Sequence, residues 1–396
     1  MSTVVTQQRK RTQQNLTVLQ IISVAVLGMI LPYSNLYLKE QDVSPTLIGT
    51  LLSVGALLRL LITPLANNIA DRLGMHRRLF KVYYGAIIVA SGLYTLARST
   101  VPLGIGLLLL EAAAAPGMVL GMQLTISKLQ HEGRTSLGTT RSFAPLGFAV
   151  ANVISCGLIA IGGYRLAFGA GGLLALATIW LAAVFPRQTM STQQSEELRD
   201  AAPVPRNRGL YILAVANFFA VMGFQSGFAF TFIHFSDNLG VPASILGLMS
   251  AWMAILEVPS FRMADTLLVR FGARKMYITG TTGMAIFFVM LGAIPNAIWL
   301  IAILVFRAAF WPMVNLSGFV VTTQMSDPRN VATNQALIQV TLPGIAALLT
   351  GSAAGWIFEH QGGLAFFAAT AIACLVGAGI ALAGYQRMAP TEPGAK

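Results

Sequence analysis

Long apolar runs alternate with short polar segments along the whole chain, and the lengths of the runs predict helices that span a membrane. Crossing the hydrocarbon core of a bilayer takes about 20 apolar residues in helical conformation. Glycine is frequent within the runs, as it is where membrane helices pack closely, and the runs lack the alternating pattern of a membrane β-barrel. We therefore predict an all-α membrane protein with twelve spans, at residues 17–38, 45–66, 80–97, 102–126, 140–162, 165–185, 209–233, 243–264, 275–294, 297–322, 333–357 and 364–385.

Composition and charge agree with a membrane protein. Hydrophobic residues make up 55% of the chain and charged residues 10%, whereas ordinary soluble domains carry roughly 25% charged residues. The net charge of +12 is unevenly distributed: with the N-terminus inside, Lys39, Arg98 and Arg165 are the basic residues of the external loops. This follows the positive-inside rule. We expect both termini in the cytoplasm, a cell-membrane location (the inner membrane if the source is bacterial), and no nucleic-acid partner.

A polar break divides the chain into two similar parts. Residues 187–208 contain most of the polar residues between spans six and seven and predict a cytoplasmic linker. The linker would join an N-terminal six-helix bundle, residues 1–186, to a C-terminal six-helix bundle, residues 209–396.

The two bundles are predicted to be repeats of one another. Parallel repeats of this kind are related by an axis along the membrane normal, and their solute site lies near the bilayer midplane between the halves. A shift of 198 positions aligns Gly49 with Gly247, Arg72 with Arg270, and Pro145 with Pro343.

Four ionisable residues stand inside predicted spans, and equivalent positions carry opposite charges. Glu111 and Arg307 are each followed by two alanines and, five positions on, by a proline, at a shift of 196 (307 − 111). The shift of 198 aligns Arg59 with Glu257 (257 − 59), a second charge pair in which equivalent positions carry opposite signs. Each charge opposes insertion by about 2.5–3.5 kcal/mol near a helix centre. We expect a functional role for the set; the alternative is a set of interhelical pairs that lock the bundle.

The loop after the second span, PLANNIADRLGMHRR, resembles the signature of the major facilitator superfamily. Asn67 stands where that signature has a glycine. The resemblance implies the major facilitator fold, with two pseudo-symmetric six-helix bundles, and a gating role for the loop residues, which in the superfamily brace the cytoplasmic helix ends. The matching residues are Asp71, Arg72, Gly74, Arg77 and Arg78.

Two further stretches resemble the subgroup that holds lactose permease, nucleoside–proton symporters and phenylpropionate permeases. They are AILEVPSFRMADTLLVRFGARK, which contains Glu257, and TTRSFAPLGF, which contains Arg141. The resemblance implies a proton-carrying role for Glu257 and a substrate contact for Arg141. Gln123 replaces the acid with which lactose permease holds galactosides, so it is a candidate contact for another substrate.

Spans 1, 4, 7 and 10 line the central cavity in the superfamily, so the resemblance makes Glu111 and Arg307 cavity residues. A guanidinium such as that of Arg307 suits a carboxylate or another anion. Helical spacing places further candidates on the same faces of spans 7 and 10: Trp311, Asn217, Gln225, Phe224 and Phe228.

The sequence predicts a secondary active transporter that takes up a small organic solute, an organic anion or an aromatic compound, with protons by alternating access. Burial favours the protonated form of a carboxylate and a nearby arginine favours the ionised form. We expect Glu257, whose surroundings resemble those of the subgroup's glutamate, to carry the proton, with Glu111 as the second candidate. The alternatives are a proton-driven efflux antiporter for drugs or metabolites and a non-transporting sensor. We expect a monomer in the lipid bilayer, without metal, cofactor or enzymatic activity, because no catalytic triad, nucleotide loop or metal-ligand spacing is readable.

Overall fold

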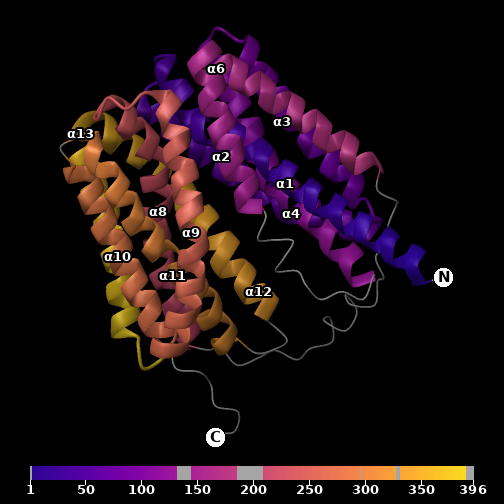
Figure 1. Cartoon of the computed structure of the whole chain (residues 1–396). Helices are drawn as coiled ribbons and strands as arrows, with labels where there is room; N and C mark the ends of the chain where they lie inside the picture. Colours follow the sequence, from indigo (N-terminus) through magenta and orange to yellow (C-terminus); the bar gives the residue numbers. More distant parts are fainter. Residues whose placement is uncertain (1, 132–143, 185–207, 295, 327–330, 389–396) are drawn as a thin grey trace, which may run out of the picture. The chain divides into compact units, whose positions relative to one another are not determined.

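The computed structural model describes residues 2–131, 144–184, 208–294, 296–326 and 331–388, and all regular structure within them is helical (Figure 1). The prediction of an all-α protein is confirmed. The helices before the predicted linker are α1 (Ser2–Glu40), α2 (Pro45–Leu73), α3 (His76–Leu96), α4 (Thr100–His131) and α6 (Ala144–Val184). Those after it are α8 (Arg208–Asp237), α9 (Ala243–Phe271), α10 (Ala273–Ala293), η1 (Ala297–Trp299), α11 (Leu300–Met325), α12 (Val331–Ala336), η2 (Leu337–Thr341) and α13 (Leu342–Ala383).

Among the described residues, ten helices are long and apolar enough to cross a membrane, where the sequence predicted twelve spans. The difference lies in α6 and α13. Each joins two helices across one glycine with left-handed backbone, Gly163 at φ 72° and Gly362 at φ 81°. A single residue of this kind interrupts the helical hydrogen bonds without forming a loop, so predicted spans on its two sides run together.

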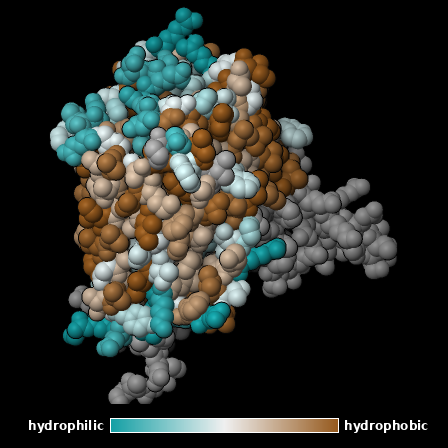
Figure 2. All heavy atoms as spheres, turned by 60° about the vertical axis from the view of Figure 1, so that its left-hand side comes forward, coloured by the Kyte–Doolittle hydropathy of each residue, from teal (hydrophilic) through white to brown (hydrophobic). Residues whose placement is uncertain are grey.

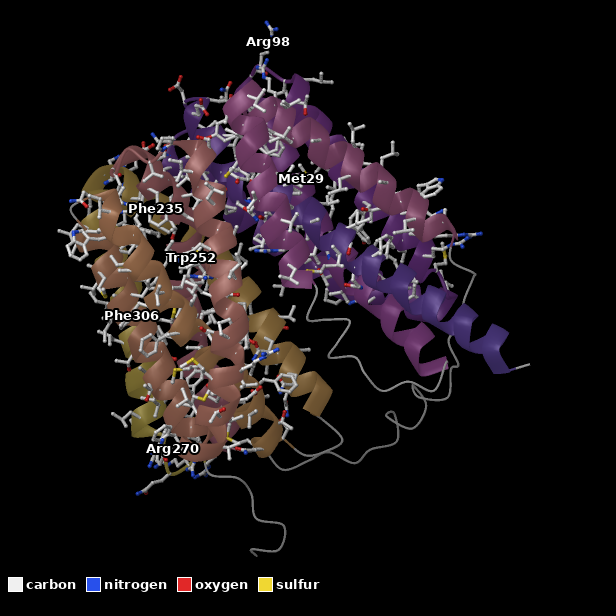
Figure 3. All side chains as sticks on the ribbon, in the orientation of Figure 1. Met29, Arg98, Phe235, Trp252, Arg270 and Phe306 are labelled. Carbon is white, nitrogen blue, oxygen red and sulfur yellow. The ribbon has the colours of Figure 1, made fainter. Side chains whose placement is uncertain are left out.

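Apolar side chains cover the outside of the helices as well as the inside. On the face shown in Figure 2, hydrophobic residues form a broad band and hydrophilic residues gather at its two ends. Ile161 and Val269 are 84% and 88% exposed. Charged Arg98 and Arg270 lie at helix ends, whereas Phe235 is fully buried (Figure 3). Because apolar surface of this extent is unfavourable in water, the distribution is that of helices surrounded by lipid.

The chain forms two compact units that follow the predicted halves except at two segments. The first unit holds Met1–Val43, Val54–Met190 and Pro242–Ala254, and the second holds Ser44–Ser53, Ser191–Val241 and Ile255–Lys396. The beginning of α2 therefore belongs to the second unit and the beginning of α9 to the first. The boundaries predicted from the sequence do not include this exchange.

Glycines at equivalent positions explain why these two helix beginnings pack where they do. In the second unit, a Cβ atom on Gly49 would collide with the backbone of Gly351 in α13. In the first unit, a Cβ atom on Gly247 would collide with Tyr33 and Cys156. Small residues let membrane helices approach this closely, and any larger side chain at either glycine would separate the helices.

The backbone carries the repeat that the sequence predicts. Left-handed residues occur at equivalent places in the two halves. α1 packs on α6 as α8 packs on α13, and α3 packs on α4 as α10 packs on α11. The left-handed pairs are Asp42 with Gly240 and Gly74 with Gly272, both at a shift of 198, and Gly163 with Gly362, at a shift of 199.

Candidate functional site

In the first unit, an ion pair joins α2 to α4. Nη1 of Arg59 lies 3.3 Å from Oε2 of Glu111, and the side chains are 34% and 10% exposed. Gly55, one turn before Arg59, allows this contact: a Cβ atom there would lie 2.7 Å from Cβ and 2.8 Å from Cγ of Glu111. The acid is therefore more closely enclosed than its arginine.

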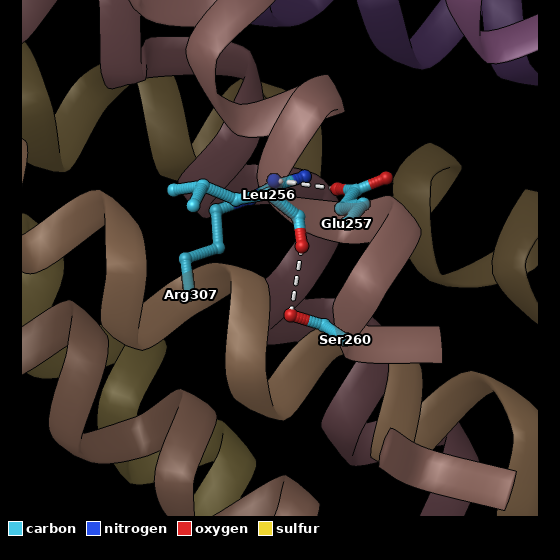
Figure 4. A network of polar contacts seen from close by, with 4 residues as sticks. All are labelled: Leu256, Glu257, Ser260 and Arg307. Carbon is cyan, nitrogen blue, oxygen red and sulfur yellow. Dashed lines mark hydrogen bonds and ion pairs between the residues drawn. The ribbon is translucent and has the colours of Figure 1, made fainter. Parts of the chain in front are cut away.

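In the second unit, an ion pair joins α9 to α11. Nη1 of Arg307 donates a hydrogen bond of 2.9 Å to Oε1 of Glu257 (Figure 4). Both side chains are largely covered, 15% exposed for the arginine and 23% for the acid. Nearby on α9, the hydroxyl of Ser260 donates to the carbonyl oxygen of Leu256 in its own helix, at 2.8 Å. The bond between Arg307 and Glu257 is charge-assisted, and such bonds are among the stronger protein hydrogen bonds.

The two ion pairs are one contact made twice with the charges reversed. Arg59 and Glu257 are equivalent positions in the repeat, but each bonds to a partner in its own unit rather than to the other. The first unit has the arginine on its second helix and the acid on its fourth, and the second unit has the opposite arrangement. This is possible because the attraction between two charges does not depend on which helix carries which sign.

A cluster of three aromatic rings lies beside Arg307, and one of the rings contacts it. Its guanidinium carbon lies 4.7 Å from the centre of the Phe228 ring, within the range of a cation–π contact. Trp311 meets Phe228 edge-on at 5.5 Å and Phe224 edge-on at 5.7 Å, and the two phenylalanine rings stack at 6.4 Å. The structure thus brings together four residues that helical spacing places on the inner faces of spans 7 and 10. Such a cluster offers one cation, one acid and flat apolar surfaces.

Two other predicted substrate contacts differ from this cluster. Asn217 is 7% exposed, and both ends of its amide are engaged. Nδ2 donates to the carbonyl oxygen of Ile338 at 3.0 Å, and Oδ1 accepts from the hydroxyl of Tyr277 at 3.3 Å. These bonds hold the fold, which argues against a direct substrate contact. Gln225 is half-buried one residue beyond Phe224 and stays a predicted contact.

The loop residues are described only in part. Gly74 has the left-handed backbone (φ 61°) that glycine adopts readily. Nη1 of Arg77 donates to the carbonyl oxygen of Ala183 at 3.4 Å, which ties the start of α3 to the end of α6, and Arg78 is exposed. The gating role stays a prediction. Arg141 and the side chains of Asp71, Arg72 and Gln123 lie outside the described residues.

Sequence reasoning missed Gly55, Tyr277 and the partner of Asn217. A glycine one turn before a charged residue within a span could have drawn attention to Gly55. Tyr277 gives no comparable signal, because its role depends on a bond from another helix. In the described part of the chain, no group of three or more histidine, cysteine, aspartate or glutamate side chains could hold a metal ion.

Comparisons with known proteins agree on one architecture. The family model described as MFS_1 like family matches residues 14–369, and no curated protein matches the chain. Nucleoside transporter NupG, in a mutant form, is similar with a TM-score of 0.78 at 16% identity over 95% of this chain and 99% of that chain. A bacterial homologue of the human lysosomal transporter Spinster gives 0.74 at 15% identity over 98% and 99%. A D-xylose–proton symporter gives 0.69 at 13% identity over 93% and 96%. At these identities the likeness is one of fold.

Proposed function

Because the chain belongs to the MFS_1 like family, whose fold it shares with major facilitator transporters, we propose that it is a secondary active transporter that moves a small organic solute together with protons by alternating access. Membrane transport follows from the family. The solute and the coupling are our proposal. The single observation that carries it is the pair formed by Glu257 and Arg307 beside an aromatic cluster within the apolar helices.

Glu257 is the proposed proton carrier, with Glu111 as the second candidate. An acid that alternates between an arginine partner and a protonated, unpaired state can bind a proton on one side of the membrane and release it on the other. Glu257 suits this role because it is less deeply covered than Glu111 and its partner Arg307 also contacts the Phe228 ring. Glu111 is more deeply covered and is clamped by Gly55.

The solute is proposed to be an organic anion or an aromatic compound. Arg307 would bind an anionic group, and Phe228 and Trp311 would contact a flat apolar part. Gln225 completes the proposed contacts in the second unit, and Glu111, Arg141 and Gln123 stay candidates. Uptake rather than efflux rests on the resemblance of the Glu257 region to proton-coupled importers. Two proteins of similar structure, a nucleoside transporter and a D-xylose–proton symporter, add nucleosides and sugars to the solutes worth testing.

We also propose twelve crossings with both termini in the cytoplasm and a monomer in the cell membrane. α6 has 41 residues and α13 has 42, which as single helices would be about 60 Å long. A bilayer core is only about 30 Å thick. Each of these helices therefore crosses twice, with its turn at Gly163 or Gly362.

The test is transport by the purified protein in proteoliposomes with an imposed pH gradient. Labelled aromatic carboxylates, nucleosides and sugars are the probes, and protein-free vesicles of the same lipid are the background. For the solute that accumulates, Glu257→Gln should keep exchange between equal pools and lose uphill accumulation. Glu111→Gln should change affinity or expression more than coupling. If both variants accumulate solute like the wild type, neither acid couples protons, and the proposal of proton coupling is wrong.

A further inference from the structure

One turn of π-helix, η2 (Leu337–Thr341), lies between α12 and α13 in the second unit. At its end, the N–H of Leu342 donates to the carbonyl oxygen of Leu337, five residues back instead of four. π-helical turns are rare in proteins as a whole, and those that do occur often lie at functional sites. Here the neighbouring residues give the turn a specific cause.

Pro343 creates the problem that η2 resolves. Continuing the π pattern would require residue 343 to donate an N–H to the carbonyl oxygen of Ile338, but proline has none. Ile338 is fully buried, so its carbonyl group would be left without a donor. Nδ2 of Asn217 on α8 supplies that donor at 3.0 Å. Tyr277 on α10 donates to Oδ1 of the same amide at 3.3 Å, which turns the NH₂ group toward Ile338.

The same segment has a second possible register. In a regular α-helix, Leu342 would donate to Ile338, and Pro343 would instead leave the carbonyl of Gln339 without a donor. Gln339 is exposed, so the cost of that unpaired carbonyl is smaller there. Each register thus leaves one carbonyl group without a backbone donor. Asn217 supplies a side-chain donor in the π register alone, and so stabilises only that register.

We infer that Asn217 and Tyr277 are positioning residues that hold η2 in its π register, and that release of Ile338 by Asn217 lets the segment pass to the α register during transport. The part of this inference that concerns transport rests on the proposed function. The part that concerns the register stands on the hydrogen bonds alone.

The change would reach the helix that carries Arg307. Moving the register by one residue rotates α12 by about 100° relative to α13. α12 is tied to α11 by Gln335, whose Nε2 donates to the carbonyl oxygen of Phe319 at 2.7 Å and to Oγ1 of Thr323 at 2.9 Å. A rotation of α12 must therefore either pull on α11 or break these bonds.

The side chains that hold η2 have no polar counterparts at the equivalent positions of the first half. Pro145 is the equivalent of Pro343, but the positions 198 residues before Asn217 and Tyr277 are Leu19 and Leu79. Neither leucine can donate a hydrogen bond. The first half therefore lacks the two side chains that stabilise the π register.

Hydrogen exchange of the full-length protein in lipid nanodiscs tests the register without any substrate. Asn217→Leu and the milder Tyr277→Phe should quicken amide exchange of residues 335–345. The expected change for Asn217→Leu is about 5- to 150-fold, the effect of losing one buried hydrogen bond. Asn152→Leu is the matched control, because the side-chain amide of that buried asparagine donates to a carbonyl oxygen of its own helix, that of Phe148. Unchanged exchange in both test variants would overturn the inference.

Pro343→Ala separates a positioning role from a merely structural one. It restores a backbone donor in either register, so the side-chain donor of Asn217 is no longer needed and the regular α register, the common one, is favoured. Asn217→Leu should then have an effect on exchange at least fivefold smaller than in the wild-type background. Combined with Asn217→Leu it should give a protein that is as stable as wild type but fixed in the α register, with transport slowed tenfold or more. A stable double variant that transports at the wild-type rate would refute the switch. Absence of transport in every protein, wild type included, would instead count against the proposed function.

Discussion

Reversing the ion pair between α2 and α4 tests whether this protein uses its charges as pairs. Arg59→Glu combined with Glu111→Arg gives the first unit the arrangement that the second unit already has. The new arginine keeps the Cβ and Cγ atoms that pack against Gly55, so the swap needs no extra room at that contact. We expect the double variant to approach wild-type stability, whereas each half of the swap alone places two like charges together and destabilises the fold.

The magnitudes follow from the exposure of the two side chains. Glu111→Gln leaves Arg59 unpaired, but that side chain is 34% exposed, so we expect a loss of only about 1 kcal/mol. Arg59→Met leaves the acid unpaired at 10% exposure, which costs about 3–5 kcal/mol when a buried pair is broken.

The assay is thermal unfolding in detergent at pH 7, together with transport in proteoliposomes. Arg98→Met, at an exposed position after α3, is the matched control and should change stability by less than about 0.5 kcal/mol. If Arg59→Met is as stable as the control at pH 7, or if the double variant is no better than the single ones, the reasoning about paired charges is wrong.

Two further substitutions test how glycine shapes the helices. Gly55→Val should destabilise the first unit by about 1–3 kcal/mol, because its Cβ would overlap Glu111; thermal unfolding that matches wild type would contradict the tight contact. Gly163→Ala should cost about 1–2 kcal/mol because of its φ of 72°. Gly157→Ala is the control, since open space surrounds that position; equal stability of these two alanine variants would rule out strain at the turn.

Most of the helices could be predicted from the sequence, because membrane spans depend on a simple physical quantity, the length of an apolar run. The same pattern could not predict that α6 and α13 continue up to their central glycines, since a turn of one residue needs no polar loop. It also could not predict the exchange of helix beginnings between the units, which depends on contacts such as that between Gly49 and Gly351.

The sequence could predict those parts of the candidate site that lie on one face of one helix. It could not predict the parts that depend on how two helices pack together. Arg307 and Trp311 lie on one face by spacing alone, and the structure adds Phe228 beside them. The bond between Asn217 and Ile338 arises from the missing N–H of a proline five residues further on. Its prediction would require knowing the register of a helix in advance.

The closure of each ion pair within one half bears on how such a chain could arise. A half whose arginine and glutamate already neutralise each other carries no uncompensated charge in its spans, as an ancestor encoded by an unduplicated gene would require. Had each charge needed a partner from the other half, that ancestor would have carried an uncompensated charge in its spans. After duplication, the two copies could reverse polarity independently, since a change in one copy left the pair in the other intact.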